Sequence, residues 1–310
     1  MADEYDIAIV GGGPAGMSAG LYAARGQRST IMFERGVIGG QIALTEAVEN
    51  YPGFPDGING FDLAQAMLKQ AEKYGQQTKY SAVTSVERAG EKFKLTASDG
   101  EEIMARTVII TAGADYNRLG IPGEDRLIGR GVSYCATCDA AFFRDQEVAV
   151  VGGGDAAMDE GLFTTKYASK AHVIHRRDEL RASAILQDRA FKNPKMNFVW
   201  DTVVEEVVGD EQVDRLKLRN VKTNEESMLD VSAIFIFIGQ TPNTDFVKDL
   251  VQRDPMGHIL VNEWMETEVP GLFAAGDARQ NAARQVASSV GDGVTAAIRA
   301  EHFLTDHYKE

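Results

Sequence analysis

Two stretches of the chain share one pattern of apolar and polar positions. Residues 6–33 run from the apolar DIAIV through GGGPAG and the helix-forming MSAGLYAARG to a second apolar stretch, STIMF. Residues 147–174 repeat this order as EVAVV, GGGDAA, a helical pattern over 159–168, and AHVI. A buried strand, a glycine-rich turn, a helix and a returning strand make a parallel βαβ unit. The sequence therefore predicts two such units in one chain.

The segments outside these two units also have periodic patterns. Helical periodicity predicts a helix over Phe61–Tyr74, and residues 80–112 alternate in short strands that end in the apolar run TVIITAG. A similar apolar run, AIFIFIGQTPN at 233–243, closes the second unit. LFAAGD at 272–277 predicts a further buried strand that ends at a sharp turn, and Val286–His307 is expected to be helical.

These elements predict an α/β protein with two Rossmann-like, three-layer nucleotide-binding domains, the second inserted into the first. Residues 1–115 and 245–310 are expected to form one discontinuous domain, because the closing segment is needed to cover the first nucleotide site. Residues 116–244 form the inserted domain, after a link that carries glycine and proline at 120–123. The chain has no low-complexity linker that would divide it further.

Composition and charge exclude several classes of protein. The chain has 310 residues, 44% of them hydrophobic and 25% charged, which is ordinary for a globular protein. Its formal net charge of -14 would repel a phosphate backbone, so nucleic acid is not an expected partner. MADEYD has no basic segment before an apolar run, and no long apolar stretch follows. We therefore expect a cytoplasmic protein that does not span a membrane.

The first glycine-rich turn has the complete dinucleotide fingerprint. Gly11, Gly13 and Gly16 lie between strand and helix, and Glu34 ends the next strand. The first glycine allows the tight turn, the second lets a pyrophosphate approach the backbone, and the third lets helix and strand pack closely. Glu34 can accept hydrogen bonds from a ribose but would repel a 2′-phosphate, so the site suits FAD or NAD. A glycine pattern alone would indicate only a tight turn.

The second fingerprint is Gly152, Gly154 and Ala157, and it leads to a basic cluster instead of a carboxylate. The cluster consists of His175, Arg176, Arg177 and Arg181. Cations at the end of this strand can bind the 2′-phosphate of NADPH. The alternative is a solvated basic loop, which is the more common role of an arginine pair. The position where a ribose carboxylate would otherwise stand favours NADPH.

The two cysteines, Cys135 and Cys138, stand in the sequence CATCD. This spacing allows a short-range disulfide, and a thiolate at the start of a helix is stabilised by the backbone N–H groups there. Zinc is the first alternative, but it needs four ligands and no second cysteine pair exists. The second alternative is an inert pair, against which the polar Thr137 and Asp139 argue. Asp139 can be either a proton donor or a helix cap.

Taken together, the motifs resemble those of the low-molecular-weight thioredoxin reductases, in the same order and over almost the whole chain. They are GGGPAG, GGQ, ENYPGFP, CATCD, GGGDAA, HRRDELRA, GQTPN, and GLFAAGD with ARQV. Larger flavin disulfide reductases carry their cysteine pair shortly after the first fingerprint, where this chain has GGQIALT. Two residues depart from the family pattern, Ala156 and Gly161, and either can weaken NADPH binding.

The resemblance implies a set of cofactor-binding and catalytic residues. The FAD-binding residues would be Gly11, Gly13, Pro14, Ala15, Gly16, Glu34, Arg35, Gly40, Gln41, Thr45, Asn50, Val83, Gly276, Asp277, Arg284, Gln285 and Val286. The NADPH-binding residues would be Gly152, Gly154, Asp155, Ala156, Ala157, His175, Arg176, Arg177 and Arg181. The catalytic residues would be Cys135, Cys138 and Asp139, with no metal.

The resemblance also implies a reaction. Electrons would pass from NADPH through FAD to the Cys135–Cys138 disulfide and then to the disulfide of thioredoxin or a thioredoxin-like protein. Cys138 would face the flavin, Cys135 would attack the partner disulfide, and Asp139 would supply the proton. Because dithiol and nicotinamide would use one flavin in turn, hinges are expected near 113–120 and 241–247. The family also implies a homodimer.

Three alternative functions remain open from the sequence. A flavin-dependent dithiol oxidase, or a reductase that serves another redox protein with another electron donor, would keep FAD and the cysteine pair, although such oxidases tend to lack the basic cluster. The peroxide-linked disulfide reductase carries an extra thioredoxin-like amino-terminal region. A non-catalytic nucleotide sensor would keep only the fold. CATCD argues against the sensor.

Overall fold

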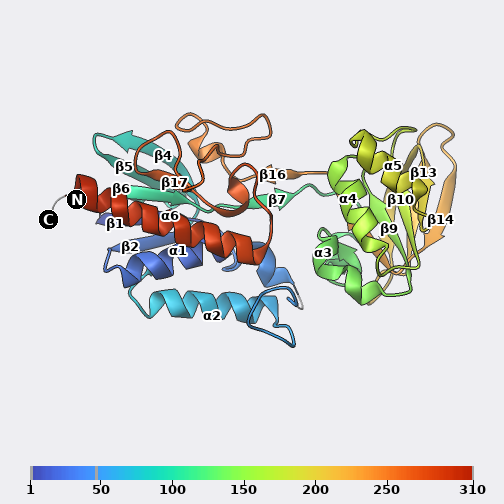
Figure 1. The fold of residues 1–310 in the computed structure, drawn as a ribbon, viewed down its shortest axis with the longest axis horizontal. Helices are drawn as coiled ribbons and strands as arrows, with labels where there is room; N and C mark the ends of the chain where they lie inside the picture. Colours follow the sequence, from blue (N-terminus) through green and yellow to red (C-terminus); the bar gives the residue numbers. More distant parts are fainter. Residues whose placement is uncertain (1–2, 46–47, 309–310) are drawn as a thin grey trace. The chain divides into compact units, whose positions relative to one another are not determined.

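The chain forms two structural units, and one is inserted into the other. The computed structural model describes residues 3–45 and 48–308, so the expected domain ends at residues 1 and 310 lie outside the described part. Unit 1 comprises Met1–Asp115 and Thr241–Glu310, and unit 2 comprises Tyr116–Gln240. The chain leaves unit 1 through β7 (Ala114–Tyr116) and returns through β16 (Gln240–Pro242), and these two strands pair with each other. Figure 1 labels both strands.

Unit 1 is built on a seven-stranded mixed sheet. Its path runs β3-β2-β1-β6-β5-β4, and β17 pairs with β6 off this path. The strands are β1 (Asp3–Val10), β2 (Thr30–Glu34), β3 (Gln77–Tyr80), β4 (Val83–Ala89), β5 (Lys92–Ala97), β6 (Glu102–Ile110) and β17 (Leu272–Ala274). The helices are α1 (Pro14–Arg25), α2 (Gly60–Glu72) and α6 (Val286–His307), with short 3₁₀ turns η1 (Gly40–Leu44), η4 (Asp245–Val247) and η5 (Gly276–Ala278).

Strand β6 holds the two parts of unit 1 together because it changes partners along its length. Its first half pairs antiparallel with β5, as in Ile103 with Leu95. Its second half pairs parallel with β17, as in Ile109 with Phe273. The carboxyl-terminal segment, which follows the inserted unit, thereby becomes part of the sheet that the amino-terminal segment begins.

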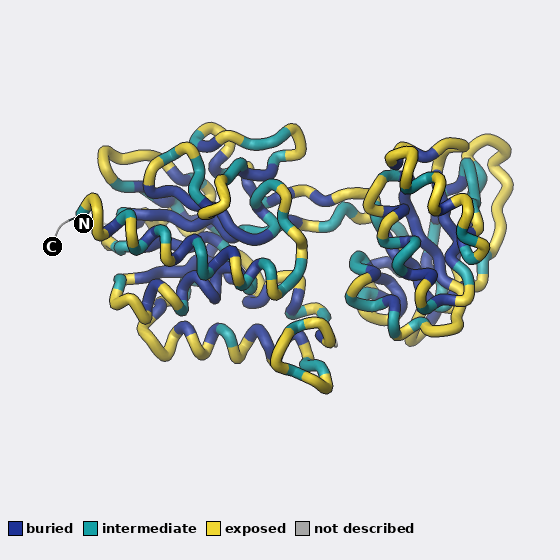
Figure 2. Tube along the Cα trace, viewed as in Figure 1, coloured by how far each residue is buried: buried dark blue, intermediate teal, exposed yellow. Residues whose placement is uncertain are grey.

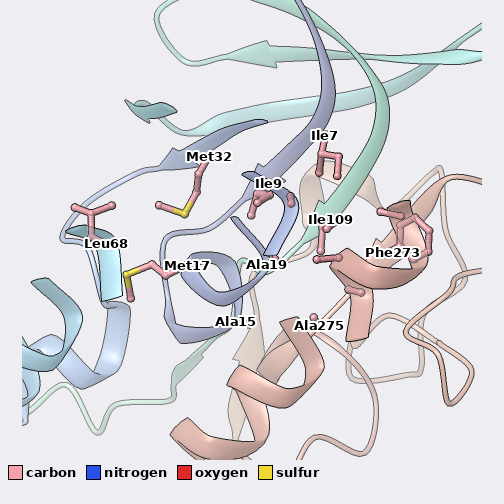
Figure 3. Close-up of a cluster of buried hydrophobic side chains, with 14 of the residues drawn as sticks. Ile7, Ile9, Ala15, Met17, Ala19, Met32, Leu68, Ile109, Phe273 and Ala275 are labelled. Atoms are coloured by element: carbon pink, nitrogen blue, oxygen red, sulfur yellow. The ribbon is translucent and has the colours of Figure 1, made fainter. Parts of the chain in front are cut away.

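Alternate residues of β1 supply two separate hydrophobic clusters. Ile7 and Ile9 belong to the cluster that contains residues of α1, α2 and α6, and Ala8 and Val10 belong to the cluster that contains residues of β4 and β5. Side chains of a strand alternate between faces, so a strand buried on both faces is apolar at every position. Figure 3 shows the first cluster, with Ile9 near Ala19 and Ile109 near Phe273. In Figure 1 the three helices lie side by side along this sheet.

Unit 2 contains two sheets and three helices. Its parallel sheet has the order β11-β10-β9-β15-β8, and an antiparallel sheet has the order β12-β13-β14. The parallel strands are β8 (Val132–Ser133), β9 (Glu147–Val151), β10 (Lys170–Ile174), β11 (Met196–Val199) and β15 (Ala233–Ile236). The antiparallel strands are β12 (Thr202–Val208), β13 (Arg215–Asn220) and β14 (Glu226–Asp230). The helical elements are η2 (Asp125–Leu127), α3 (Ala136–Asp139), η3 (Ala140–Phe143), α4 (Asp155–Thr164) and α5 (Ala184–Lys192).

The parallel sheet of unit 2, like β1 of unit 1, is buried on both faces, and this gives unit 2 three layers. Val148 and Val150 of β9 pack into a cluster with residues of α3, α4 and α5. Ala149 and Val151 pack into a second cluster with residues of β12 and β13. Figure 2 shows the central strands of each unit as buried. The predicted α/β class with two Rossmann-like units is therefore confirmed; the main sheet of unit 1 is mixed, whereas unit 2 has separate parallel and antiparallel sheets.

The structure corrects several expected element bounds. The helix expected over 159–168 spans Asp155–Thr164, because Gly154 has extended backbone and starts the helix directly after the turn. Helix α2 ends at Glu72, shortly before the expected Tyr74, whereas α6 has the expected bounds. The sequence pattern predicts neither β3 nor β11, nor the antiparallel sheet β12-β13-β14.

Candidate active site: two glycine-rich turns and a redox disulfide

The glycines of the first turn differ in what surrounds them. Gly11 has φ +116°, and a Cβ there would lie 2.3 Å from the carbonyl oxygen of Thr111. A Cβ on Gly16 would lie 1.9 Å from the carbonyl oxygen of Gly11, so helix α1 packs directly on the turn. A Cβ on Gly13 would meet no atom within 4 Å. The first and third glycines are thus required by the fold, whereas the second faces open space that a ligand can use.

Glu34 closes this turn with both carboxylate oxygens. Oε2 accepts a hydrogen bond from the backbone N–H of Gly12 at 2.7 Å, and Oε1 accepts one from the N–H of Gly36 at 2.7 Å. Each oxygen of a carboxylate has a second lone pair, so Glu34 can still accept from a ligand hydroxyl. The end of β2 and the glycine turn are therefore fixed to each other.

The segment after β17 reaches the same turn. A Cβ on Gly276 would lie 3.1 Å from the Cβ of Ala15, and the Gly276 N–H donates to Oδ2 of Asp292 at 3.1 Å. Arg279 holds Asp292 in place through an ion pair of 2.7 Å in which both side chains are largely buried. No sequence motif indicates Asp292 or Arg279, although both position GLFAAGD against the first fingerprint.

Asp277 has a buried oxygen that lacks a protein partner. Its Oδ1 makes no hydrogen bond with any described residue. Burial raises the pKa of this carboxyl, and the nearby Arg284 guanidinium opposes the shift. Because an unpaired buried polar atom costs about 1–3 kcal/mol, such an atom beside a glycine turn indicates a site for a polar ligand.

The other residues expected around the flavin lie at several places in unit 1. Asn50 Nδ2 donates to Gln285 Oε1 at 3.2 Å, which joins ENYPGFP to the start of α6. Arg35 forms an exposed ion pair with Asp115 at 2.8 Å, and Val83 is buried in β4. The remaining expected residues occupy turns or helix starts: Gly40, Gln41 and Thr45 in or just after η1, Pro14 at the start of α1, and Arg284 and Val286 just before and at the start of α6.

The second turn repeats the geometry of the first. Gly152 has φ +147°, and a Cβ there would lie 2.5 Å from the carbonyl oxygen of Phe237 and 2.7 Å from the Cβ of Ala157. A Cβ on Gly154 would meet no atom within 4 Å. Asp155 begins α4, and its Oδ1 accepts from the N–H of Ser183 at 2.5 Å. Ala156 is exposed on the first turn of the helix.

The basic cluster divides into a buried histidine and exposed arginines. The His175 ring lies under the turn, since a Cβ on Gly153 would lie 2.3 Å from its Cε1. Burial, with the neighbouring arginine charges, lowers the pKa of His175, so this ring is neutral near pH 7. Arg176, Arg177 and Arg181 are exposed, and the Arg181 N–H donates to the Gly153 carbonyl at 2.7 Å. The positive charge beside the second turn therefore comes from arginine.

Cys135 and Cys138 form a disulfide with a Cα–Cα distance of 5.3 Å. Cys135 is the N-cap residue of the one-turn helix α3, and Cys138 lies within that helix. Both cysteines are partly exposed, and Cys135 Sγ lies 3.3 Å from the hydroxyl of Thr137. A disulfide that another protein can reach is suited to thiol–disulfide exchange.

Asp139 lies next to this disulfide and is connected to it through Ser133. The Ser133 hydroxyl donates to Asp139 Oδ2 at 2.6 Å and accepts from the Cys135 N–H at 3.1 Å. The Asp139 side chain makes no cap hydrogen bond to η3, which it precedes. Burial raises the pKa of Asp139, and the Ser133 hydrogen bond partly offsets this shift. A carboxyl with a raised pKa beside a disulfide is suited to hold and release a proton.

Two dinucleotide turns and an accessible disulfide on one chain define the class of pyridine-nucleotide disulfide oxidoreductases. The family model described as "Pyridine nucleotide-disulphide oxidoreductase" matches residues 5–293. The thioredoxin reductase of Listeria innocua is 46% identical and covers 99% of this chain and 97% of its own. That of Bacillus subtilis is 45% identical, with 99% and 97% covered.

Solved structures agree with these relatives. The crystal structure of thioredoxin reductase from Streptococcus pyogenes has a TM-score of 0.94 at 45% identity and covers 99% of this chain and 100% of its own. That of thioredoxin reductase from Giardia duodenalis has a TM-score of 0.93 at 35% identity, with 98% and 99% covered. This chain belongs to the pyridine nucleotide-disulphide oxidoreductase family and, within it, to the thioredoxin reductases.

The family implies FAD and NADPH as cofactors, and both turns have features that fit a dinucleotide. In unit 1 the open face at Gly13 and the unpartnered oxygen of Asp277 both provide places for polar ligand groups. In unit 2 the open face is at Gly154, and the carbonyl of the neighbouring Gly153 accepts a hydrogen bond from the Arg181 N–H. The strand beside the first turn ends in Glu34, whereas the strand beside the second turn leads to Arg176, Arg177 and Arg181, which is the difference expected between a site for FAD and one for a 2′-phosphate.

Proposed function

We propose that this chain uses NADPH, through FAD, to reduce the disulfide of thioredoxin or a thioredoxin-like protein. The observation that carries this proposal is the partly exposed Cys135–Cys138 disulfide in the unit that also contains the arginine-flanked turn. A purely structural disulfide has no need to be accessible to another protein, and a nucleotide sensor needs no disulfide at all. The family assignment supports the same reaction.

We propose that unit 1 holds FAD. The open face of Gly13 would take the pyrophosphate, and Glu34 would accept hydrogen bonds from the adenosine ribose. The unpartnered Asp277 oxygen would accept from a hydroxyl of the cofactor, which offsets the cost of its burial. The full set expected from the sequence, including Arg35, Gly40, Gln41, Thr45, Asn50, Val83 and Arg284 to Val286, remains a prediction.

We propose that unit 2 holds NADPH at the second turn. Arg176, Arg177 and Arg181 would bind the 2′-phosphate through charge-assisted hydrogen bonds. His175 would support the turn from below instead of contributing charge, because its ring is buried under Gly153. The residues Gly152, Gly154, Asp155, Ala156 and Ala157 would line the dinucleotide.

The residues of this chain then divide the work at the disulfide. When both cofactors are bound, FAD supplies a route for two electrons from NADPH to the disulfide. The Cys135 thiolate would attack the partner disulfide, and Cys138 would resolve the mixed disulfide. Asp139, with its raised pKa, would hold the proton that a leaving thiolate needs.

Anaerobic titration of the purified holoprotein tests this function. NADPH should bleach the flavin absorbance and produce two new thiols per chain, whereas NADH at the same concentration should act far more slowly. Oxidised thioredoxin should then restore the starting spectrum and sustain turnover. A flavin that neither nucleotide bleaches would contradict the proposal and favour a dithiol oxidase or a reductase with another electron donor.

We further propose that the chain works in the cytoplasm as a homodimer, with the hinges expected near 113–120 and 241–247. Among the described residues, no helix combines the length and apolarity that a membrane span requires. Sedimentation equilibrium of the holoprotein tests the dimer, and a monomer at micromolar concentration would contradict it.

A further inference from the structure

A carboxylate from a neighbouring helix binds the backbone of the redox motif. Oε2 of Glu160, on α4, accepts from the N–H groups of Ala136 at 3.1 Å and Thr137 at 3.3 Å. Ala136 and Thr137 are the two residues between the cysteines, so this carboxylate bonds to the centre of the CATC motif. Helix α4 packs against α3, which fixes the Glu160 backbone relative to the disulfide.

The Thr137 N–H matters because it lies at the second position of α3, from which a thiolate of the N-cap residue could accept a hydrogen bond. Cys135 is the N-cap of α3, and an N-cap side chain ordinarily accepts hydrogen bonds from the first turn of its helix. Such bonds lower the pKa of a cysteine and stabilise the reduced state of a C-x-x-C pair. In this structure Glu160 accepts the Thr137 N–H, together with that of Ala136, and brings a carboxylate to the backbone between the two cysteines.

The charges on the packed elements add to this effect. Helix α4 carries Asp155, Asp159 and Glu160, α3 carries Asp139, and η3 carries no titratable residue. These three elements, all within the described residues, contain no lysine, arginine or histidine. Just before Cys135, the Tyr134 hydroxyl donates to Glu124 at 2.7 Å, and the Arg118 guanidinium lies over the Tyr134 ring, 5.9 Å from its centroid. On α3, η3 and α4 every charged group is therefore acidic and disfavours a thiolate, and Arg118 is the cation beside Tyr134.

We propose that Glu160 is a positioning residue that keeps the Cys135–Cys138 pair strongly reducing. This inference rests on the proposed reductase function, in which the dithiol gives two electrons and two protons to the partner disulfide and returns to the disulfide. A carboxylate that takes the Thr137 N–H donor from the thiolate and repels the thiolate destabilises the reduced pair. Electron transfer to the partner is then more favourable. The role belongs to the charge of Glu160, and its packing contribution is separate.

Three variants separate charge from packing. Glu160→Gln keeps the size and one acceptor oxygen but removes the charge, whereas Glu160→Asp keeps the charge on a shorter side chain. Glu211→Gln removes one charge from an exposed position of the same unit and serves as the control. Bound-flavin absorbance and thermal unfolding establish that each variant is folded.

The measurement is the dithiol–disulfide equilibrium of each anaerobic holoprotein in glutathione buffers without NADPH, read by alkylation and mass. In Glu160→Gln we expect a shift toward the dithiol of about fivefold near pH 9, about 20 mV since tenfold is about 30 mV. Near pH 6 the shift should be small, because both thiols are then protonated in either protein. The pH profile of alkylation should also show a lower thiol pKa.

The outcomes separate this inference from the proposed function. Glu160→Asp and Glu211→Gln should follow the unaltered chain. An equal shift at both pH values, or equal behaviour of the Gln and Asp variants, would overturn the charge role. If Glu160→Gln proved unstable, a shift toward the dithiol in Glu160→Asp at either pH would overturn the charge role, because that variant keeps the charge. Since glutathione replaces NADPH here, failure of NADPH to bleach the flavin would contradict only the reductase function.

Discussion

At the residue scale, Asp139 combines a catalytic position with a cost to stability. Burial raises its pKa above the ordinary 3.8, so the folded chain binds a proton here more tightly than the unfolded chain does. Stability therefore falls as pH rises from that ordinary value through the raised one, and the penalty stays in full above it. Asn cannot ionise, so Asp139→Asn should be more stable than the unaltered chain near neutral pH.

The same substitution should impair the reaction. Loss of a positioned proton donor typically lowers a rate by about a hundredfold or more, so we expect turnover on thioredoxin to fall by that order. Urea unfolding at about pH 4 and at about pH 7 would show a stability gain only at the higher pH. A variant that lost stability at neutral pH, or kept full turnover, would contradict the role given to Asp139.

The arginines beside the second turn give the second prediction. Arg177→Ala should raise the KM for NADPH about ten- to a hundredfold, because a charge-assisted hydrogen bond contributes about 1.5–3 kcal/mol. The KM for NADH, which has no 2′-phosphate, should hardly change. Arg189, exposed on α5, provides the matched control, and Arg189→Ala should leave both values as they are. Equal losses with both nucleotides would indicate that Arg177 supports the fold instead.

Some residues of the site could be predicted from the sequence, and others could not. The glycines of both turns and the CATCD cysteines act within short segments, so their spacing alone indicates what they do. Asp292 and Glu160 act across the fold, on Gly276 and on the Ala136 and Thr137 backbone. A single carboxylate on a helix has no local pattern that distinguishes such a partner from solvent, so sequence analysis missed both.

At the element scale, contact between α1 and α6 depends on a glycine. A Cβ on Gly293 would lie 2.1 Å from the carbonyl oxygen of Ala15, in the first turn of α1. Gly293→Ala should therefore push the helices apart and destabilise unit 1 by about 1–3 kcal/mol. Ala15 lies in the first fingerprint, so we also expect weaker FAD retention, measured as flavin released on dilution.

Gly291, on the same helix, provides the control. A Cβ there would meet no atom within 4 Å, and the residue is exposed. Gly291→Ala should stabilise the chain by about 0.5–1 kcal/mol, because alanine loses less backbone entropy in a helix. Thermal unfolding with FAD bound compares the two variants. If both alanines changed stability in the same direction, close packing at Gly293 would not be the cause.

Elements whose patterns are strictly periodic could be predicted, and the others could not. Helix α6 has the expected bounds because its buried positions, from Ser289 to Leu304, recur at helical spacing. Strands β3 and β11 lie at sheet edges and are short, QTKY and MNFV, so neither has an apolar run. Strand β13, RLKLRN, does alternate and pairs in the antiparallel sheet, but its charged residues obscure the pattern.

At the scale of the whole molecule, the insertion follows from how the cores are divided. Each of the four hydrophobic clusters of described residues draws its members from one unit only. The sequence indicated this division because a second complete βαβ unit needs its own faces covered. The residue at which the chain re-enters unit 1 was harder to predict. The first domain was expected to resume at residue 245, whereas unit 1 resumes at Thr241. Strand β16 pairs with β7, a contact that no local pattern indicates.

Unit 2 should therefore fold as an excised fragment, Tyr116–Gln240. Its ends are adjacent, because the Asn117 N–H donates to the Gly239 carbonyl at 3.0 Å, and its two clusters need no residue from unit 1. We expect a single cooperative thermal transition, native-like near-ultraviolet circular dichroism, and thiol reactivity of the reduced cysteines within about twofold of the full chain. The complementary chain, with residues 116–240 replaced by a short Gly/Ser linker, should still retain FAD. A fragment that melted without cooperativity would show that the core of unit 2 is incomplete without unit 1, and the two-domain interpretation would then fail at the level of folding while the site chemistry stood unaffected.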